Sequence, residues 1–198
     1  MSRRTLRTLI LLIGIATGVM LGVALSSRAG DGGRGVAWTS RTVTVRIYTT
    51  VNWHPLIERS IADFNAIMPR RGPRLVMKVQ GERSCAWVKR QTFRKPTITM
   101  CSQPDGNGAG WAVYRVDHGT LAGQRVWITL VGDPGHDRYQ GHQNTVCHEL
   151  MHAVSGVNDG WGEPRSCVRG DLDAPGAWDV AYLERVYANT KGRRRGNK

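Results

Sequence analysis

Five consecutive residues, His148-Glu149-Leu150-Met151-His152, carry side chains suited to metal-assisted hydrolysis. On a helix, His148 and His152 are four residues apart and project from one face, so both imidazoles can bind the same metal ion. Glu149 follows the first histidine, where its carboxylate can take a proton from a metal-bound water without binding the metal. Zinc suits this pattern because it lowers the pKa of that water to about 7 and polarises a carbonyl. The pentapeptide therefore predicts two zinc ligands, His148 and His152, and a general base, Glu149.

A third ligand must come from outside the pentapeptide. Gly156 follows the second histidine and lets the chain turn sharply out of the helix, which can bring a later side chain back to the metal. The residues that could then complete the site are Asp159, Glu163, Asp171, Asp173 and, on the other side of the motif, His142.

The order of these residues resembles the metzincin clan of zinc peptidases. In that order, His-Glu-x-x-His is followed by Gly and then by a third ligand three residues later. An aspartate in place of the usual third histidine resembles the snapalysin branch, which consists of small secreted peptidases of actinomycetes. The resemblance covers residues 148–159 and implies that Asp159 is the third zinc ligand. It also implies a peptidase activity. Two features differ from metzincins. The spacing from the second histidine to Gly156 is one residue longer, and no Met follows Met151 to form the methionine turn of that clan.

Hydrophobic patterning predicts an α+β domain around this motif. By the resemblance, this would be a zincin/metzincin-like mixed sheet with an active-site helix and a C-terminal helix. Alternating β-branched and apolar residues predict strands at 42–48, 74–79, 97–101, 112–116 and 125–131. Helical spacing of apolar residues predicts helices at 55–68, 144–155 and 177–188. Gly156 stands where a helix C-cap is expected.

The N-terminal 29 residues are typical of an export signal. Three arginines, Arg3, Arg4 and Arg7, precede an apolar and glycine-rich run at residues 9–25. A cleaved signal peptide and an uncleaved transmembrane anchor at 9–25 are the two alternatives, and both place the rest of the chain outside the cell. We therefore expect a secreted or membrane-anchored extracellular protein. It would have a glycine-rich linker at 30–37, a domain at 38–190 and a basic tail at 191–198.

Four cysteines fit an exported protein, in which two disulfides are the usual outcome. Four cysteines allow three pairings, and we favour Cys85–Cys101 with Cys147–Cys167 because this pairing closes the two shortest loops. Zinc ligation by cysteine is disfavoured because the chain contains no Cys-x-x-Cys pair.

The chain is strongly basic, with a net charge of +13 from 28 Lys and Arg against 15 Asp and Glu. Nine of these cations lie in the export segment and the basic tail, and no nucleic-acid-binding motif accompanies them. We therefore expect no specific nucleic-acid partner. A hydrophobic content of 40% indicates a folded domain.

The expected function is a zinc-dependent metalloendopeptidase that hydrolyses peptide bonds in proteins or peptides through a metal-activated water. A substrate strand would add to the sheet edge beside the motif helix, and the protein would act as a monomer. The alternatives are a catalytically inactive zinc-site domain that binds a protein or cell-wall partner, and a cationic surface-binding protein. Tyr182 or Tyr187 could stabilise an oxyanion, although packing in the last helix is the simpler role for both.

Overall fold

The computed structural model describes residues 35, 37–104, 110–117, 120–135, 141–157, 159, 162–169 and 172–188. The chain divides into two compact units, Met1–Gly33 and Arg34–Lys198, and every described residue lies in the second. The expected export segment and the basic tail lie outside the described residues. Within the part of the chain that is described, no helix is long and apolar enough to cross a bilayer.

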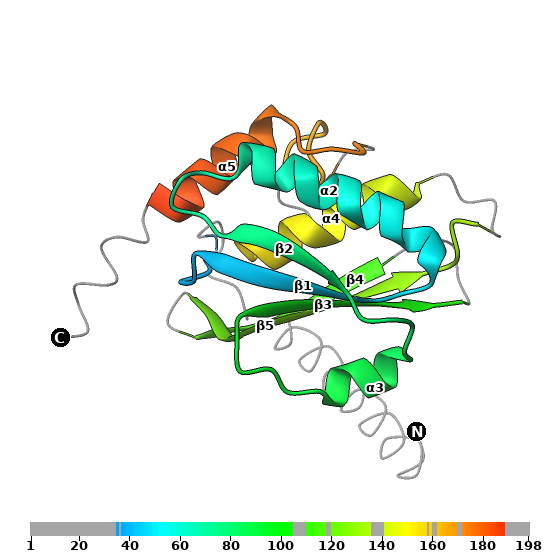
Figure 1. Cartoon of the computed structure of the whole chain (residues 1–198). Coiled ribbons are helices and arrows are strands. Elements are labelled where there is room, and N and C mark those ends of the chain that lie inside the picture. The colour runs from blue at the N-terminus through cyan, green and yellow to red at the C-terminus, as the bar shows by residue number, and fades with distance from the viewer. Residues whose placement is uncertain are drawn as a thin grey trace, which may run out of the picture. The chain divides into compact units, whose positions relative to one another are not determined.

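Five strands form one mixed sheet in the order β2-β1-β3-β5-β4 (Figure 1). Their bounds are β1 (Thr42–Tyr48), β2 (Arg74–Val79), β3 (Thr97–Gln103), β4 (Gly110–Asp117) and β5 (Thr120–Val131). Neighbouring strands from β2 to β5 run parallel, and β4 joins the edge of the sheet antiparallel to β5. The predicted α+β class with a mixed sheet is confirmed.

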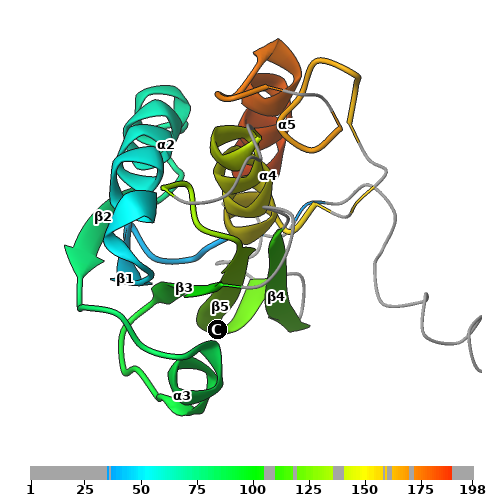
Figure 2. The same cartoon turned by 90° about the vertical axis from the view of Figure 1, so that its right-hand side faces the viewer.

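Helices lie on both faces of the sheet. Figures 1 and 2 show α2 (His54–Ile67), α4 (His142–Ser155) and α5 (Ala177–Ala188) on one face and the short α3 (Cys85–Arg90) on the other. A single turn of 3-10 helix, η1 (Val51–Trp53), leads into α2. Side chains point alternately to the two faces along β1, which explains the core between the sheet and these helices. Val43, Val45 and Ile47 are fully buried beneath the helices, and the residues between them face the other side.

Predicted and observed elements agree closely, and where their bounds differ the shift is one or two residues except at the start of β5. β5 starts at Thr120 and α4 at His142, earlier than the apolar patterns indicate. The sequence analysis missed α3, which has only six residues and no hydrophobic repeat long enough to reveal it. Instead, this helix is held by a Ser84 side-chain cap on the Trp87 N–H and by the Cys85–Cys101 disulfide to β3. The second disulfide joins Cys147 in α4 to Cys167, so the favoured pairing is the one observed.

The C-terminal end of α4 is capped by residues from distant parts of the chain. Gly156 adopts φ 62° and donates its N–H to His152 O at 2.9 Å, as expected for a helix C-cap. Trp38 Nε1 donates to Ala153 O at 2.8 Å, and the Tyr187 hydroxyl donates to Val154 O at 2.5 Å. These bonds satisfy carbonyls that have no partner within the helix. The end of the motif helix is therefore fixed by side chains from both ends of the domain.

Two described residues of the expected linker at 30–37 pack against these helices. Ala37 is 3% exposed. A Cβ on Gly35 would meet the Val186 side chain and lie 3.0 Å from the Tyr182 hydroxyl, so only glycine fits this approach to α5.

Candidate metal centre

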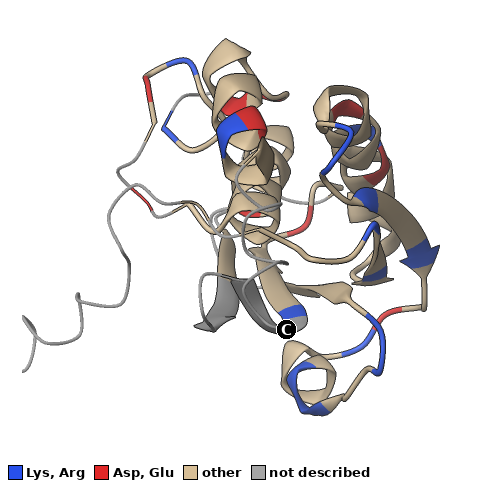
Figure 3. Ribbon diagram, turned by 90° about the vertical axis from the view of Figure 1, so that its left-hand side faces the viewer, with Lys and Arg blue, Asp and Glu red and all other residues tan. Residues whose placement is uncertain are grey.

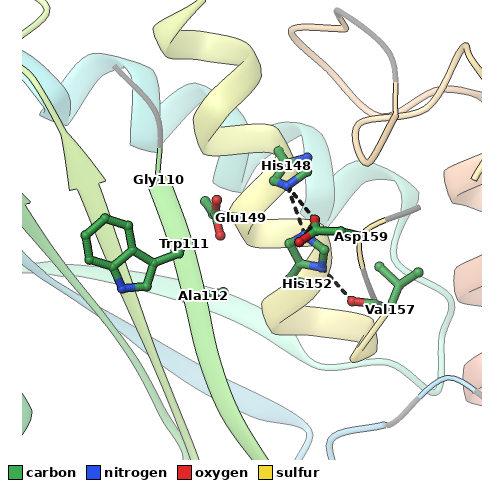
Figure 4. Close-up of a pocket in the computed structure, with 8 residues that line it drawn as sticks. All are labelled: Gly110, Trp111, Ala112, His148, Glu149, His152, Val157 and Asp159. Carbon is green, nitrogen blue, oxygen red and sulfur yellow. Dashed lines mark hydrogen bonds and ion pairs between the residues drawn. The ribbon is translucent and has the colours of Figure 1, made fainter. Parts of the chain in front are cut away.

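Three side chains converge on one point beside the edge strand (Figure 4). His148 Nε2 and His152 Nε2 are 3.0 Å apart. Asp159 Oδ1 lies 3.2 Å from His148 Nε2 and 2.9 Å from His152 Nε2. Within the described part of the chain, these three residues are the one group of His, Cys, Asp and Glu that could hold a metal ion.

The spacing of the three ligand atoms fits one face of a tetrahedral zinc site. Zinc bound at about 2.0–2.1 Å in tetrahedral geometry places neighbouring ligand atoms about 3.3 Å apart. The separations of 2.9–3.2 Å are close to this value. Asp159 is 83% exposed and His152 only 8%, so the group is anchored in the protein on the helix side and open on the loop side. An open side is what a catalytic metal site requires.

Backbone carbonyls orient both imidazole rings. His148 Nδ1 lies 3.2 Å from Cys167 O, and His152 Nδ1 lies 2.5 Å from Val157 O. A carbonyl can only accept a hydrogen bond, so each Nδ1 carries the proton and donates it. In the neutral ring, the lone pair then lies on Nε2 and points at the shared centre. This is the usual arrangement of metal-binding histidines.

The charge states favour a cation at this centre. Burial has the largest effect on the pKa of His152 and lowers it. The hydrogen bond to the Val157 carbonyl acts in the opposite direction. The ring of His152 is therefore neutral at physiological pH, with its Nε2 lone pair facing the Asp159 carboxylate. Electron-pair donors at such short separations repel one another, and a cation bound between them turns this repulsion into attraction.

Glu149 lies beside the three ligands and does not join them. Its side chain lines the same pocket, together with Gly110, Trp111 and Ala112 of β4 (Figure 4). The residue is 2% exposed, and its Oε2 has no hydrogen-bond partner among the described residues. Burial and the nearby Asp159 charge raise the pKa of Glu149 to about 8, and a bond from the Ala112 N–H lowers it in part. A cation on the three ligands would lower this pKa further and favour the carboxylate.

The close approach of β4 to α4 shapes this pocket. A Cβ at Gly110 would lie 3.1 Å from Glu149 Cγ and 3.0 Å from the backbone O of Thr129. A larger residue where the edge strand passes over the motif helix would therefore require Glu149 or the backbone of β5 to shift by a few tenths of an ångström. No glycine motif in the sequence revealed this close approach, because it depends on a contact between distant segments.

The alternative third ligands are not in the group. His142 is the first residue of α4 and does not lie several positions before it; it is 5% exposed and packs edge-on against Trp53 at 4.9 Å. Glu163 and Asp173 are described and lie outside the three-residue group. Asp171 lies outside the described residues.

The two candidate tyrosines belong to the core. Tyr182 is 4% exposed and stacks on Trp178 with a centroid separation of 4.9 Å. Tyr187 is fully buried, and its hydroxyl is bonded to α4. Neither residue lines the pocket that holds Glu149 and the three ligands.

Asp179 is a further residue that supports the site, and sequence reasoning missed it. This fully buried carboxylate accepts from the Cys167 N–H at 2.9 Å and from the Gly176 N–H at 2.8 Å, both at Oδ2. Burial raises the pKa of Asp179, and the backbone N–H bonds lower it in part. Because Cys167 O accepts from His148, Asp179 and the Cys147–Cys167 disulfide together position the residue whose carbonyl orients the first histidine.

We predict that Asp179→Ala lowers metal affinity about 10–100-fold, as loss of a supporting partner typically does. The metal affinity of Asp179→Asn should stay close to that of the wild type, because the amide oxygen can accept both N–H bonds that Oδ2 accepts in the wild type. Competition against a chromophoric chelator below the unfolding temperature measures this affinity. Ile57→Ala, which truncates a buried side chain of α2, is the control for general loss of stability. Equal affinity in the Ala and Asn variants would contradict the positioning role.

The raised pKa of Glu149 predicts how stability depends on pH in the metal-free protein. Folding raises this pKa from 4.5 to about 8, so the carboxyl stabilises the fold below about pH 4.5 and loses that contribution as the pH rises to about 8. Glu149→Gln has no charge to bury and should become increasingly more stable than wild type across this range. Urea unfolding of both proteins in chelator measures the difference. A difference that does not vary with pH would refute the prediction.

No model of a protein family matches the chain, and no curated protein matches it.

Proposed function

We propose that the chain is a metzincin-like, zinc-dependent endopeptidase that acts on proteins or peptides outside the cytoplasm. One observation carries the proposal: Glu149, a buried carboxylate with one oxygen that no described residue bonds, lies in the same pocket as the converging donor atoms of His148, His152 and Asp159. Two disulfides favour an oxidising compartment. The metzincin pattern at residues 148–159 supports the reaction class.

Zinc is the proposed metal because the donor set is two imidazole nitrogens and one carboxylate, with an open side. When bound, zinc supplies Lewis acidity, which lowers the pKa of a water molecule and polarises a peptide carbonyl. The protein's own contribution is to fix the two Nε2 atoms through the carbonyls of Val157 and Cys167.

Glu149 is the proposed general base and then general acid. Its carboxylate would take the proton of the attacking water and return it to the leaving amine as the peptide bond breaks. The Ala112 N–H bonds the carboxylate and orients it, while burial keeps bulk water from competing for it. Oε2, which has no hydrogen-bond partner in the described part of the chain, is the oxygen that would receive the proton.

The edge strand β4 is the proposed platform for the substrate. Among the described strands β4 pairs with β5 alone and stands at the edge of the sheet, a position that can accept an extended peptide by main-chain hydrogen bonds. Gly110, Trp111 and Ala112 of this strand line the pocket that holds Glu149. A peptide paired with this edge would bring its backbone carbonyls beside the ligand group.

Glu149→Gln should lower peptide hydrolysis by roughly 10²–10⁴-fold while leaving the bound zinc in place. The amide is isosteric but accepts no proton at neutral pH. Turnover of a quenched peptide library and metal analysis by mass spectrometry measure the two quantities on the same sample. Full activity in this variant would refute the mechanism. Wild-type protein that holds one zinc ion but cleaves no peptide would support the alternative of an inactive zinc-site domain.

Asp159→Ala should reduce zinc content well below one ion per chain, because only two histidines would remain to hold the metal. Asp173→Ala is the matched control, since it removes an exposed carboxylate from the same region outside the ligand group. Metal analysis after dialysis against a weak chelator tests both variants. Unchanged zinc in the Asp159 variant would remove this residue from the site.

A further inference from the structure

The sheet face opposite α2 and α4 carries cations that lie over aromatic rings. We call this surface the cationic face and define it by four pairs of side chains. They are Arg46 over Phe93 at 4.8 Å, Arg83 over Trp87 at 5.8 Å, Lys89 over Trp111 at 5.7 Å and Arg125 over Trp127 at 5.0 Å. The pairs come from β1, β4, β5, α3 and the segments that flank α3. Figure 3 shows Lys and Arg gathered around α3, on the side of the sheet away from the long helices.

Carboxylates do not neutralise these cations. Across the described ranges, none of the four is in an ion pair with Asp or Glu, and the hydrogen bonds of the arginines go to neutral acceptors. Arg46 Nη1 bonds Gln80 Oε1 at 2.9 Å, and Arg125 Nη1 bonds Gln91 O at 3.2 Å. Residues 74–95 contain seven Lys and Arg and one acid, Glu82. The ring beneath each cation helps to hold it in place, and Arg83 and Lys89 are the two exposed cations of this face.

The cationic face meets the proposed active-site cleft at Trp111. This residue is 40% exposed and lies on β4 between Gly110 and Ala112, which also line the cleft. Its ring projects from the strand on the side away from Glu149 (Figure 4). Lys89 lies over that ring, so a cation borders the edge strand on this face.

We propose that the substrates of this site are acidic polypeptides. This inference rests on the proposed function. An extended segment that pairs with β4 alternates its side chains, so every second one points to the cationic face. Asp or Glu at those positions meets Lys89 and the wider positive charge of the face. The free edge of a strand selects a peptide backbone, which distinguishes a polypeptide from other polyanions.

Direct binding tests the proposal without turnover. The full chain carrying Glu149→Gln and loaded with zinc is titrated with a labelled peptide of alternating Glu and Ser, and with matched Gln/Ser and Lys/Ser peptides. We expect the Glu/Ser peptide to bind at least about tenfold tighter than the Gln/Ser peptide, with an affinity that falls as salt is added. Equal affinity for the Glu/Ser and Gln/Ser peptides would overturn the proposal.

Charge reversal locates the contact. In the same background, Lys89→Glu should remove the preference for the Glu/Ser peptide, and Arg83→Glu is a second exposed position with the same expected direction. Arg59→Glu is the matched control, since it changes the net charge equally on the exposed surface of α2, across the sheet. If the Arg59 and Lys89 variants lost the preference for the Glu/Ser peptide equally, the assignment to the cationic face would be overturned.

A third comparison separates polypeptide from other polyanions. Polyuridylate and polygalacturonate carry negative charge without a peptide backbone, and we expect both to bind more weakly than the Glu/Ser peptide. Equal or tighter binding of either polymer would overturn the assignment to polypeptide. Because these measurements use a variant without turnover, they stand apart from the hydrolysis assay, which alone tests the proposed reaction.

Discussion

Two backbone carbonyls determine the chemistry that the motif helix can perform. Val157 O and Cys167 O each accept the Nδ1 proton of a histidine, and this leaves both Nε2 lone pairs directed at one point. If either carbonyl moved, the ring could rotate or change tautomer, and the donors would no longer converge. The loop that follows α4 therefore matters as much as the helix, because it carries both carbonyls as well as Asp159.

The rest of the fold fixes the position of that loop relative to the helix. The α4 helix is buried along almost its whole length, and His148 is one of the few positions on it that reach solvent. The Cys147–Cys167 disulfide and the carboxylate of Asp179 fix the loop from two sides. On the opposite side of the cleft, β4 approaches so closely that a Cβ at Gly110 would lie 3.1 Å from Glu149 Cγ. Stability and chemistry therefore depend on the same contacts.

The sequence predicted the features that have a local signature. The four-residue spacing of His148 and His152, the cap at Gly156, the main strands and the disulfide pairing all follow from residue type and separation along the chain. Contacts between distant segments left no such signature. A carbonyl that orients a histidine can belong to any residue, so Cys167 O and its support from Asp179 were not predictable. The Lys89–Trp111 pair likewise exists only because α3 lies on the face of the sheet toward which Trp111 projects (Figure 1), and α3 was too short to recognise.

The carbonyls at the end of α4 bond to Trp38, near the start of the domain, and to Tyr187, near its end. A chain still being synthesised has made both histidines long before it has made Tyr187, and it also lacks Asp179 and Cys167 at that stage. The end of α4 therefore gains the last of these hydrogen-bond partners only when the last helix joins the domain. A partly made chain therefore lacks the complete site, and the proposed hydrolytic activity would arise at the end of folding.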